Sequence, residues 1–179
     1  MSIKIKAGDF ADLDESKFFG EIVLPEKWLK DDVFGEDEIF LCQIKLEDVA
    51  VYDRANHLPK SGTLYFFLDG GSATTKGVVR YFCGVADAYT DFNEGFEEYE
   101  EDEIPIEISD CDEPTGSAML CRDEKLLDNE ICLLRIDANE LGIEFLKDAG
   151  GMLYFAIDKD DLKRKDFSKV VTFVGEQSN

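Results

Sequence analysis

The sequence predicts an α+β fold of mostly antiparallel β-sheet with short helices, containing an internally duplicated strand-helix-strand unit. The first observation is a matching pair of apolar segments, residues 39–49 and 131–141, each typical of a buried strand followed by a helix start. The second is a pair of Gly-x-Leu-Tyr-Phe segments, residues 62–69 and 151–158, each ending in Asp. Five of these eight positions are identical, which favours duplication over similarity of composition. The repeat halves span approximately 39–69 and 131–158 of a single domain, 1–179.

A helix is expected between the strands of the second unit. Asp137 suits an N-cap, and Glu140 follows three residues later, at the spacing of a capping box. Leu141, Phe145 and Ala149 then recur at helical spacing, and the glycine pair that follows is suited to end the helix.

The rest of the chain supplies further strand and turn signals. Residues 78–82 read as a strand that follows a Gly/Ser/Thr-rich connection, and residues 158–165 read as a capped helical turn with acids first and bases last. Residues 167–174 read as a final strand. The single tryptophan, Trp28, is expected in the core or covering one end of the sheet.

The composition is that of a soluble globular protein. A chain of 179 residues with 44% apolar content buries about 70% of its unfolded surface. No apolar stretch approaches the ~20 residues of a membrane span, and the N-terminus lacks an apolar signal core. The five cysteines include no C-x-x-C pair, which indicates reduced thiols. We therefore expect a cytoplasmic protein.

The net charge restricts the possible partners. The chain has 41 acidic residues against 19 basic ones, which gives a formal charge of −22. A field of this sign repels nucleic acid and anionic lipid, so neither nucleic acid nor a membrane is expected as a partner. The same field attracts a cation or a basic protein.

The acidic residues concentrate in a window without any lysine or arginine, between Arg80 and Arg122. Its densest part predicts a partner-binding site made of Asp91, Glu94, Glu97, Glu98, Glu100, Glu101, Asp102 and Glu103. The alternative is a solvated face, which is the usual role of a charge run. The interleaved Phe96 and Tyr99 have the spacing to anchor one helical face, or could serve as exposed contacts.

No motif indicates a metal site, a cofactor or a catalytic centre. The acidic segment resembles the start of an EF-hand at Asp91 and Asn93, but its glycine stands at the fifth loop position and its twelfth position is Asp102, not Glu. The only histidine, His57, lies in an expected loop without a nucleophile signature in the chain. The residues therefore favour a non-catalytic protein, with no cofactor and no metal.

The chain resembles the YwqG-like family of bacterial proteins, a domain of unknown function. The residues that carry the resemblance are 16–20, 24–25, 40–44, 46–48, 58–69, 151–155, 161–162 and 166–168. The family's Trp-Pro pair is replaced here by Trp28-Leu29, and its Gly-Tyr-Pro segment is not recognisable near residues 115–120. The resemblance implies a duplicated α+β fold and no established activity. Some relatives accompany bacterial toxin systems, which implies an immunity-type role.

Two functions follow as hypotheses. The first is a non-catalytic, acidic protein-binding module that captures a basic protein partner, for example a basic toxin. The second is an enzyme or small-ligand binder with a cleft between the two repeats, lined by pairs such as Gln43 with Arg135 or Asp69 with Asp158. A third reading treats the acidic segment as a device for solubility alone.

Overall fold

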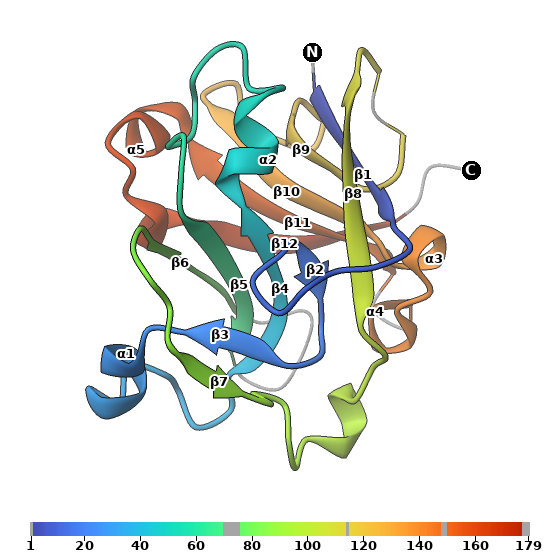
Figure 1. Cartoon of the computed structure of the whole chain (residues 1–179). Helices are drawn as coiled ribbons and strands as arrows, with labels where there is room; N and C mark the ends of the chain where they lie inside the picture. Colours follow the sequence, from blue (N-terminus) through green and yellow to red (C-terminus); the bar gives the residue numbers. More distant parts are fainter. Residues whose placement is uncertain (1, 70–75, 114, 148–149, 177–179) are drawn as a thin grey trace.

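A ten-stranded antiparallel sheet dominates the fold, which confirms the predicted mostly antiparallel sheet with short helices (Figure 1). The computed structural model describes residues 2–69, 76–113, 115–147 and 150–176. Within these residues the sheet runs in the order β12 (Val171–Glu176), β11 (Gly151–Asp158), β10 (Glu130–Asp137), β9 (Ala118–Cys121), β1 (Ser2–Ala7), β8 (Ile104–Cys111), β2 (Lys17–Phe18), β4 (Ile39–Lys45), β5 (Thr63–Asp69) and β6 (Lys76–Phe82).

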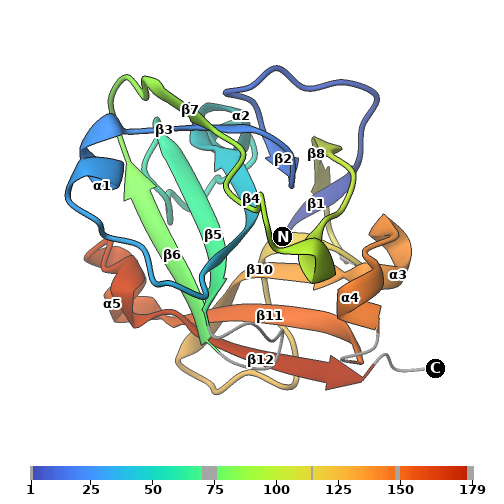
Figure 2. The same ribbon diagram turned by 90° about the horizontal axis from the view of Figure 1, so that it is seen from below.

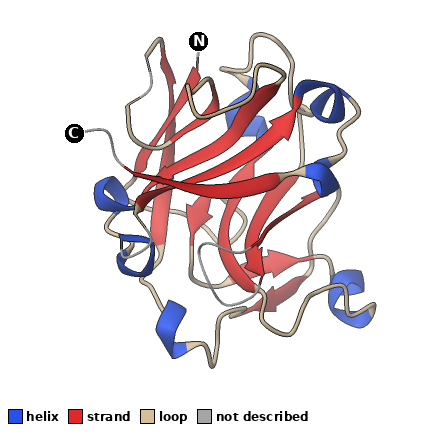
Figure 3. Cartoon of the chain, turned by 180° about the vertical axis from the view of Figure 1, so that it is seen from behind, coloured by secondary structure: helices blue, strands red, loops and turns tan. Residues whose placement is uncertain are grey.

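The remaining elements are short and lie around this sheet (Figure 3). Strands β3 (Ile22–Leu24) and β7 (Ala88–Thr90) form a separate antiparallel pair. The helices are α1 (Glu26–Lys30), α2 (Leu46–Ala50), α3 (Ala138–Leu141), α4 (Glu144–Lys147) and α5 (Lys159–Lys163), with 3₁₀ turns η1 (Glu97–Tyr99) and η2 (Phe167–Lys169).

The two ends of the sheet meet, so that the sheet curls around a shared core. The N–H of Gly77 in β6 donates to Oγ1 of Thr172 in β12 at 2.8 Å, and Figure 2 shows these strands converging. A Cβ on Gly77 would lie 2.1 Å from the Thr172 side chain, so this approach requires glycine. Across the core, the rings of Phe66 and Phe155 pack edge to face with centroids 5.1 Å apart.

Burial on both faces explains why β4 and β5 are apolar almost throughout. Leu41 and Phe66 belong to the main core, whereas Phe40 and Phe67 belong to a second cluster beneath β3. A strand covered on both faces reads as a continuous apolar run and not as an alternation. Trp28 packs at the edge of the second cluster, with its ring centroid 5.6 Å from that of Tyr65, as expected of a cover.

The predicted repeat halves have matching strand registers. Gln43 lies opposite Tyr65 in the β4–β5 pair, and Arg135 lies opposite Tyr154 in the β10–β11 pair. Each pair has a register shift two residues earlier, at Leu41 in β4 and at the corresponding position in β10, which is the mark of a β-bulge.

The correspondence extends to segments that sequence comparison did not pair. The hydroxyls of Ser16 and Ser117 each accept a hydrogen bond at 2.9 Å from the backbone N–H of the residue that ends β4 or β10. Three residues later, Phe19 and Leu120 adopt left-handed conformations with φ of 53° and 50°, which are uncommon for bulky side chains. The two units therefore share local geometry; their origin by duplication stays a prediction.

The helical segment of the second unit differs from the expected single helix. Oδ1 of Asp137 caps α3 as predicted, accepting the N–H groups of Asn139 and Glu140 at 3.0 and 3.1 Å. The helix is terminated by Gly142, which has a left-handed conformation with φ of 78°, and α4 follows as a separate helix. The Glu140 side chain does not complete a capping box, because it is bonded to Lys4 and to the backbone of Ser117.

At the C-terminus the predicted helical turn is confirmed and the final strand is shorter than expected. Oδ1 of Asp158 caps α5 by accepting the N–H of Asp160 at 2.7 Å. The strand begins only at Val171, because the residues before it form η2. Most of the predicted Gly/Ser/Thr-rich connection, residues 70–75, lies outside the described residues.

Candidate functional site

All eight predicted partner-binding residues lie on one surface segment, residues 91–103, which we call the acidic loop. It runs from the end of β7 through η1 to the start of β8, and forms the light-green stretch at the bottom of Figure 1. Asn93 fixes its start, because its side-chain amide accepts the N–H of Phe40 at 2.8 Å and donates to the carbonyl of the same residue at 2.9 Å.

The aromatic residues of the acidic loop are anchors. Tyr99 is buried and packs edge to face on Phe145, with centroids 5.2 Å apart. Phe96 is half-buried against the main core, and Phe92 packs on Phe34 at 4.9 Å. Low solvent exposure and the adjacent charge of Glu98 raise the pKa of Tyr99. Of the two roles left open for Phe96 and Tyr99, the structure shows the anchoring one.

Two of the predicted acids have internal partners. Oε1 of Glu101 accepts the backbone N–H groups of Glu144 and Phe145 at 2.7 and 3.4 Å, and so caps α4. Oε2 of Glu103 lies 2.7 Å from Nζ of Lys17, whose side chain is only 1% exposed. These carboxylates hold the second end of the acidic loop against the sheet.

The other six acids face solvent. They are Asp91, Glu94, Glu97, Glu98, Glu100 and Asp102, and within the described part of the chain none of their side chains has a hydrogen bond or ion pair. Because the neighbouring sequence from residue 81 to 121 has no lysine or arginine, their field is not neutralised locally. The acidic loop thus presents six unpaired carboxylates on a backbone that is fixed at both ends.

Of the two residue pairs proposed for a cleft between the repeats, Gln43 and Arg135 are kept apart. Gln43 and Arg135 are separated in the sheet by β2, β8, β1 and β9. Nε2 of Gln43 donates to two backbone carbonyls, and Arg135 bonds to Asp123 at 3.1 Å. Asp69 pairs in register with Lys76. These residues, like the cap Asp158, have structural roles.

The Arg135–Asp123 pair forms a buried polar cluster with Tyr154. The hydroxyl of Tyr154 donates to Oδ2 of Asp123 at 3.2 Å. Burial would raise the pKa of Asp123, but the N–H of Lys125, the Tyr154 hydroxyl and the Arg135 guanidinium outweigh it and lower that pKa. The side chains of all three residues are thus bonded to one another within the fold.

Two cavities differ in which parts of the chain line them. The cavity beside Gln43 has a volume of about 480 Å³, and all its lining residues lie between 14 and 86. A second cavity, of about 520 Å³, is lined by residues from both halves of the sequence, including His57 and Arg122. We call it the His57 cavity. No sequence pattern indicated this cavity, because its lining residues come from separate segments spread between Ser2 and Lys159.

The cysteines and acids form no metal site among the described residues, where no group of three or more His, Cys, Asp or Glu side chains has the arrangement to hold an ion. All five thiols are free. Cys121 and Cys132 lie opposite each other in β9 and β10 and are fully buried.

Comparison with known proteins gives a partial match. Residues 88–174 match the family described as Domain of unknown function (DUF1963). This region contains the acidic loop and the whole second unit. The search of curated proteins gave no match. In the described part of the chain, none of the helices combines the length and the apolar character that crossing a membrane requires. Residues 88–174 are thus similar to an uncharacterised domain family.

Proposed function

We propose that this protein is a non-catalytic binding module that captures a basic protein through the acidic loop. The observation that supports this most directly is the set of six exposed, unpaired carboxylates on a loop fixed by Asn93, Tyr99, Glu101 and Glu103. A solvated face that served solubility alone would not need such fixing.

The fixed backbone has an energetic consequence for binding. Loop ordering is one of the costs of association, and a preorganised loop does not incur it. The carboxylates also act at long range, because complementary charge raises association rates and makes them dependent on salt. Binding through the acidic loop should therefore be fast and weaken steeply with ionic strength.

The partner that fits is a protein with a lysine- and arginine-rich surface. A toxin whose active site binds nucleic acid has such a surface, and an acidic module that covers it would act as an immunity-type protein in the bacterial cytoplasm. The resemblance to the YwqG-like family supports this proposal by association. We also infer that the two units arose by duplication, supported by their shared registers and by the matched positions of Ser16 and Ser117.

The test compares two variants that lose the same charge. The loop variant carries Gln at the exposed loop positions Glu94, Glu97, Glu98 and Glu100. The control variant carries Gln at four exposed glutamates elsewhere, namely Glu21, Glu36, Glu107 and Glu124. Each protein is used as bait in native lysate and eluted with a salt gradient. The association rate of the recovered partner is then measured with purified proteins.

We expect the recovered partner to be basic and to associate at least about tenfold more slowly with the loop variant than with wild type. The control variant should stay close to the wild-type rate. Equal losses in both variants would show that net charge alone acts, and a partner retained equally by all three baits would exclude the acidic loop as the binding surface.

A further inference from the structure

The His57 cavity lies at the end of the molecule opposite the acidic loop. Its lining includes Ser2 at the start of β1, near the N-terminal label at the top of Figure 1. Its floor is apolar, formed by Leu120 of β9 and Ile131 of β10, both only 6% exposed. A volume of about 520 Å³ is within the usual range of small-molecule sites.

The corresponding position in the other unit is filled. Leu120 corresponds to Phe19, since both follow the matched serines by three residues and both have positive φ. The ring of Phe19 packs against that of Phe145, with centroids 6.0 Å apart, and Phe145 in turn packs against Tyr99. The space beside Leu120 is thus an open cavity, whereas the matching space beside Phe19 is filled by aromatic side chains.

Arg122 gives this cavity its first recognition group. The other four arginines of the chain each pair with a carboxylate, in the pairs Arg54–Asp110, Arg80–Glu38, Arg135–Asp123 and Arg164–Asp161. Across residues 2–69, 76–113, 115–147 and 150–176, Arg122 has no hydrogen bond or ion pair. In a chain with 41 acids, a guanidinium left open beside a cavity is available to an anionic group.

His57 and Lys159 are held at the same cavity by the surrounding structure. The N–H of His57 donates to the buried carboxylate of Asp53 at 3.0 Å, and its carbonyl accepts from Nζ of Lys165. The backbone of His57 is therefore fixed at both its N–H and its carbonyl. Lys159 is the first residue of α5 and is held by a 2.6 Å bond from its Nζ to the carbonyl of Asp128.

Two exposed acids on the lining, Asp112 and Glu113, restrict the charge of a ligand. Together with the overall charge of −22, they repel a polyanion such as a nucleotide polyphosphate. A single negative charge can instead meet Arg122 and Lys159 while its organic body covers the apolar floor.

We propose that the His57 cavity binds a small organic carboxylate. Its carboxylate meets the Arg122 guanidinium, supported by Lys159 and His57, and its apolar body contacts Leu120 and Ile131. This site shares no residue with the acidic loop, so a failure of one proposal leaves the other unaffected.

The test is a titration of the ¹⁵N-labelled full chain with benzoate, with benzyl alcohol as a neutral probe of the same shape and phenyl phosphate as a dianionic one. We expect benzoate to shift the backbone resonances of Leu120, Arg122 and Ile131, and to bind at least tenfold more tightly than either other probe. Arg122→Gln should weaken benzoate binding by about ten- to hundredfold, the usual contribution of a charge-assisted hydrogen bond.

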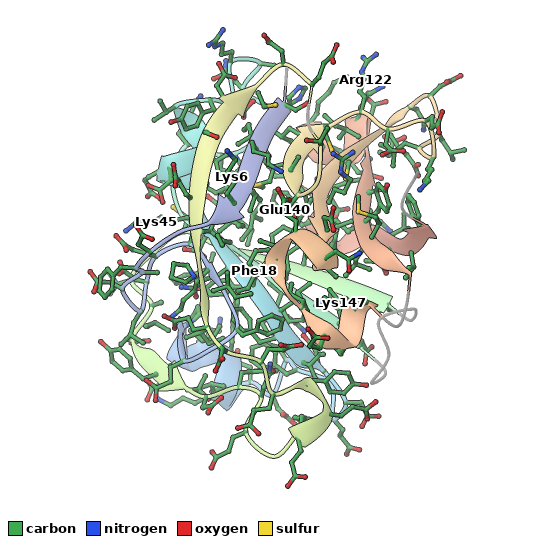
Figure 4. All side chains as sticks on the ribbon, turned by 90° about the vertical axis from the view of Figure 1, so that its right-hand side faces the viewer. Lys6, Phe18, Lys45, Arg122, Glu140 and Lys147 are labelled. Atoms are coloured by element: carbon green, nitrogen blue, oxygen red, sulfur yellow. The ribbon has the colours of Figure 1, made fainter. Side chains whose placement is uncertain are left out.

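Lys6→Gln is the matched control, because it removes one positive charge from an exposed residue of β1 that stands apart from Arg122 in Figure 4. It should leave benzoate affinity unchanged. Resonance dispersion of each variant checks that it is folded. Equal affinity for benzoate and benzyl alcohol, tighter binding of phenyl phosphate, equal losses in both variants, or an absence of shifts at the cavity would each overturn the proposal.

Discussion

Replacing Glu103 with glutamine should destabilise the fold, although Glu103 lies in a run of surface acids. Its carboxylate is the counter-charge of Lys17, 2.7 Å away, and the Lys17 side chain is 1% exposed whereas that of Glu103 is 36% exposed. Breaking a buried pair by removing one partner costs about 3–5 kcal/mol. Because water reaches Glu103, we expect the lower end, about 3 kcal/mol. For a chain of this length the melting temperature should fall by about 6–12 °C.

Glu98→Gln is the control for this prediction. Glu98 is exposed and lies five residues earlier in the same loop, so its loss should change the free energy of unfolding by less than about 0.5 kcal/mol. Urea and thermal unfolding of both variants would be measured in one buffer. A third variant, Lys17→Met combined with Glu103→Gln, removes the unpaired ammonium and should recover part of the lost stability.

Equal stability of the Glu103→Gln and Glu98→Gln variants would refute this reasoning. It would mean that the Lys17 ammonium finds water or another acceptor when Glu103 is neutral. The acidic loop would then lack one of its fixed ends, and the argument that it is preorganised for binding would lose that support.

Two further predictions concern other buried charges. The lowered pKa of Asp123 means that its ionised form stabilises the fold at pH above about 3.9, and this contribution is lost as pH falls through the folded-state pKa. The stability difference between wild type and Asp123→Asn should therefore shrink between about pH 6 and pH 3 in urea unfolding, and a constant difference would contradict the assignment. Arg80 lies 4.7 Å from the ring centroid of Phe34 and pairs with the buried Glu38. Arg80→Lys should thus cost about 1–2 kcal/mol by calorimetry, whereas the exposed Arg164→Lys should cost less than about 0.5 kcal/mol; similar losses would count against the stacking.

The sequence by itself indicated the strands that became β4, β5, β6, β10, β11 and β12, the mostly antiparallel fold class, and the location of the exposed charge. The apolar runs at 39–45 and 131–136 became β4 and β10 because such residues gain most by burial between two layers. The caps Asp137 and Asp158 could be predicted from the sequence because a capping side chain bonds to backbone N–H groups only two or three positions away. The acidic loop could be predicted from the sequence because no lysine or arginine nearby in the chain neutralises its negative charge.

Only the tertiary structure decided what each charged side chain does. Glu101 and Glu103 look like their neighbours in sequence, yet their partners lie 43 and 86 residues away. Glu140 has capping-box spacing but bonds to Lys4, 136 residues distant. His57 is fixed by Lys165, 108 residues away. Local sequence sets periodicity and caps through short-range hydrogen bonds, whereas the pairing of buried charges and the shape of a cavity depend on which strands the curled sheet brings together.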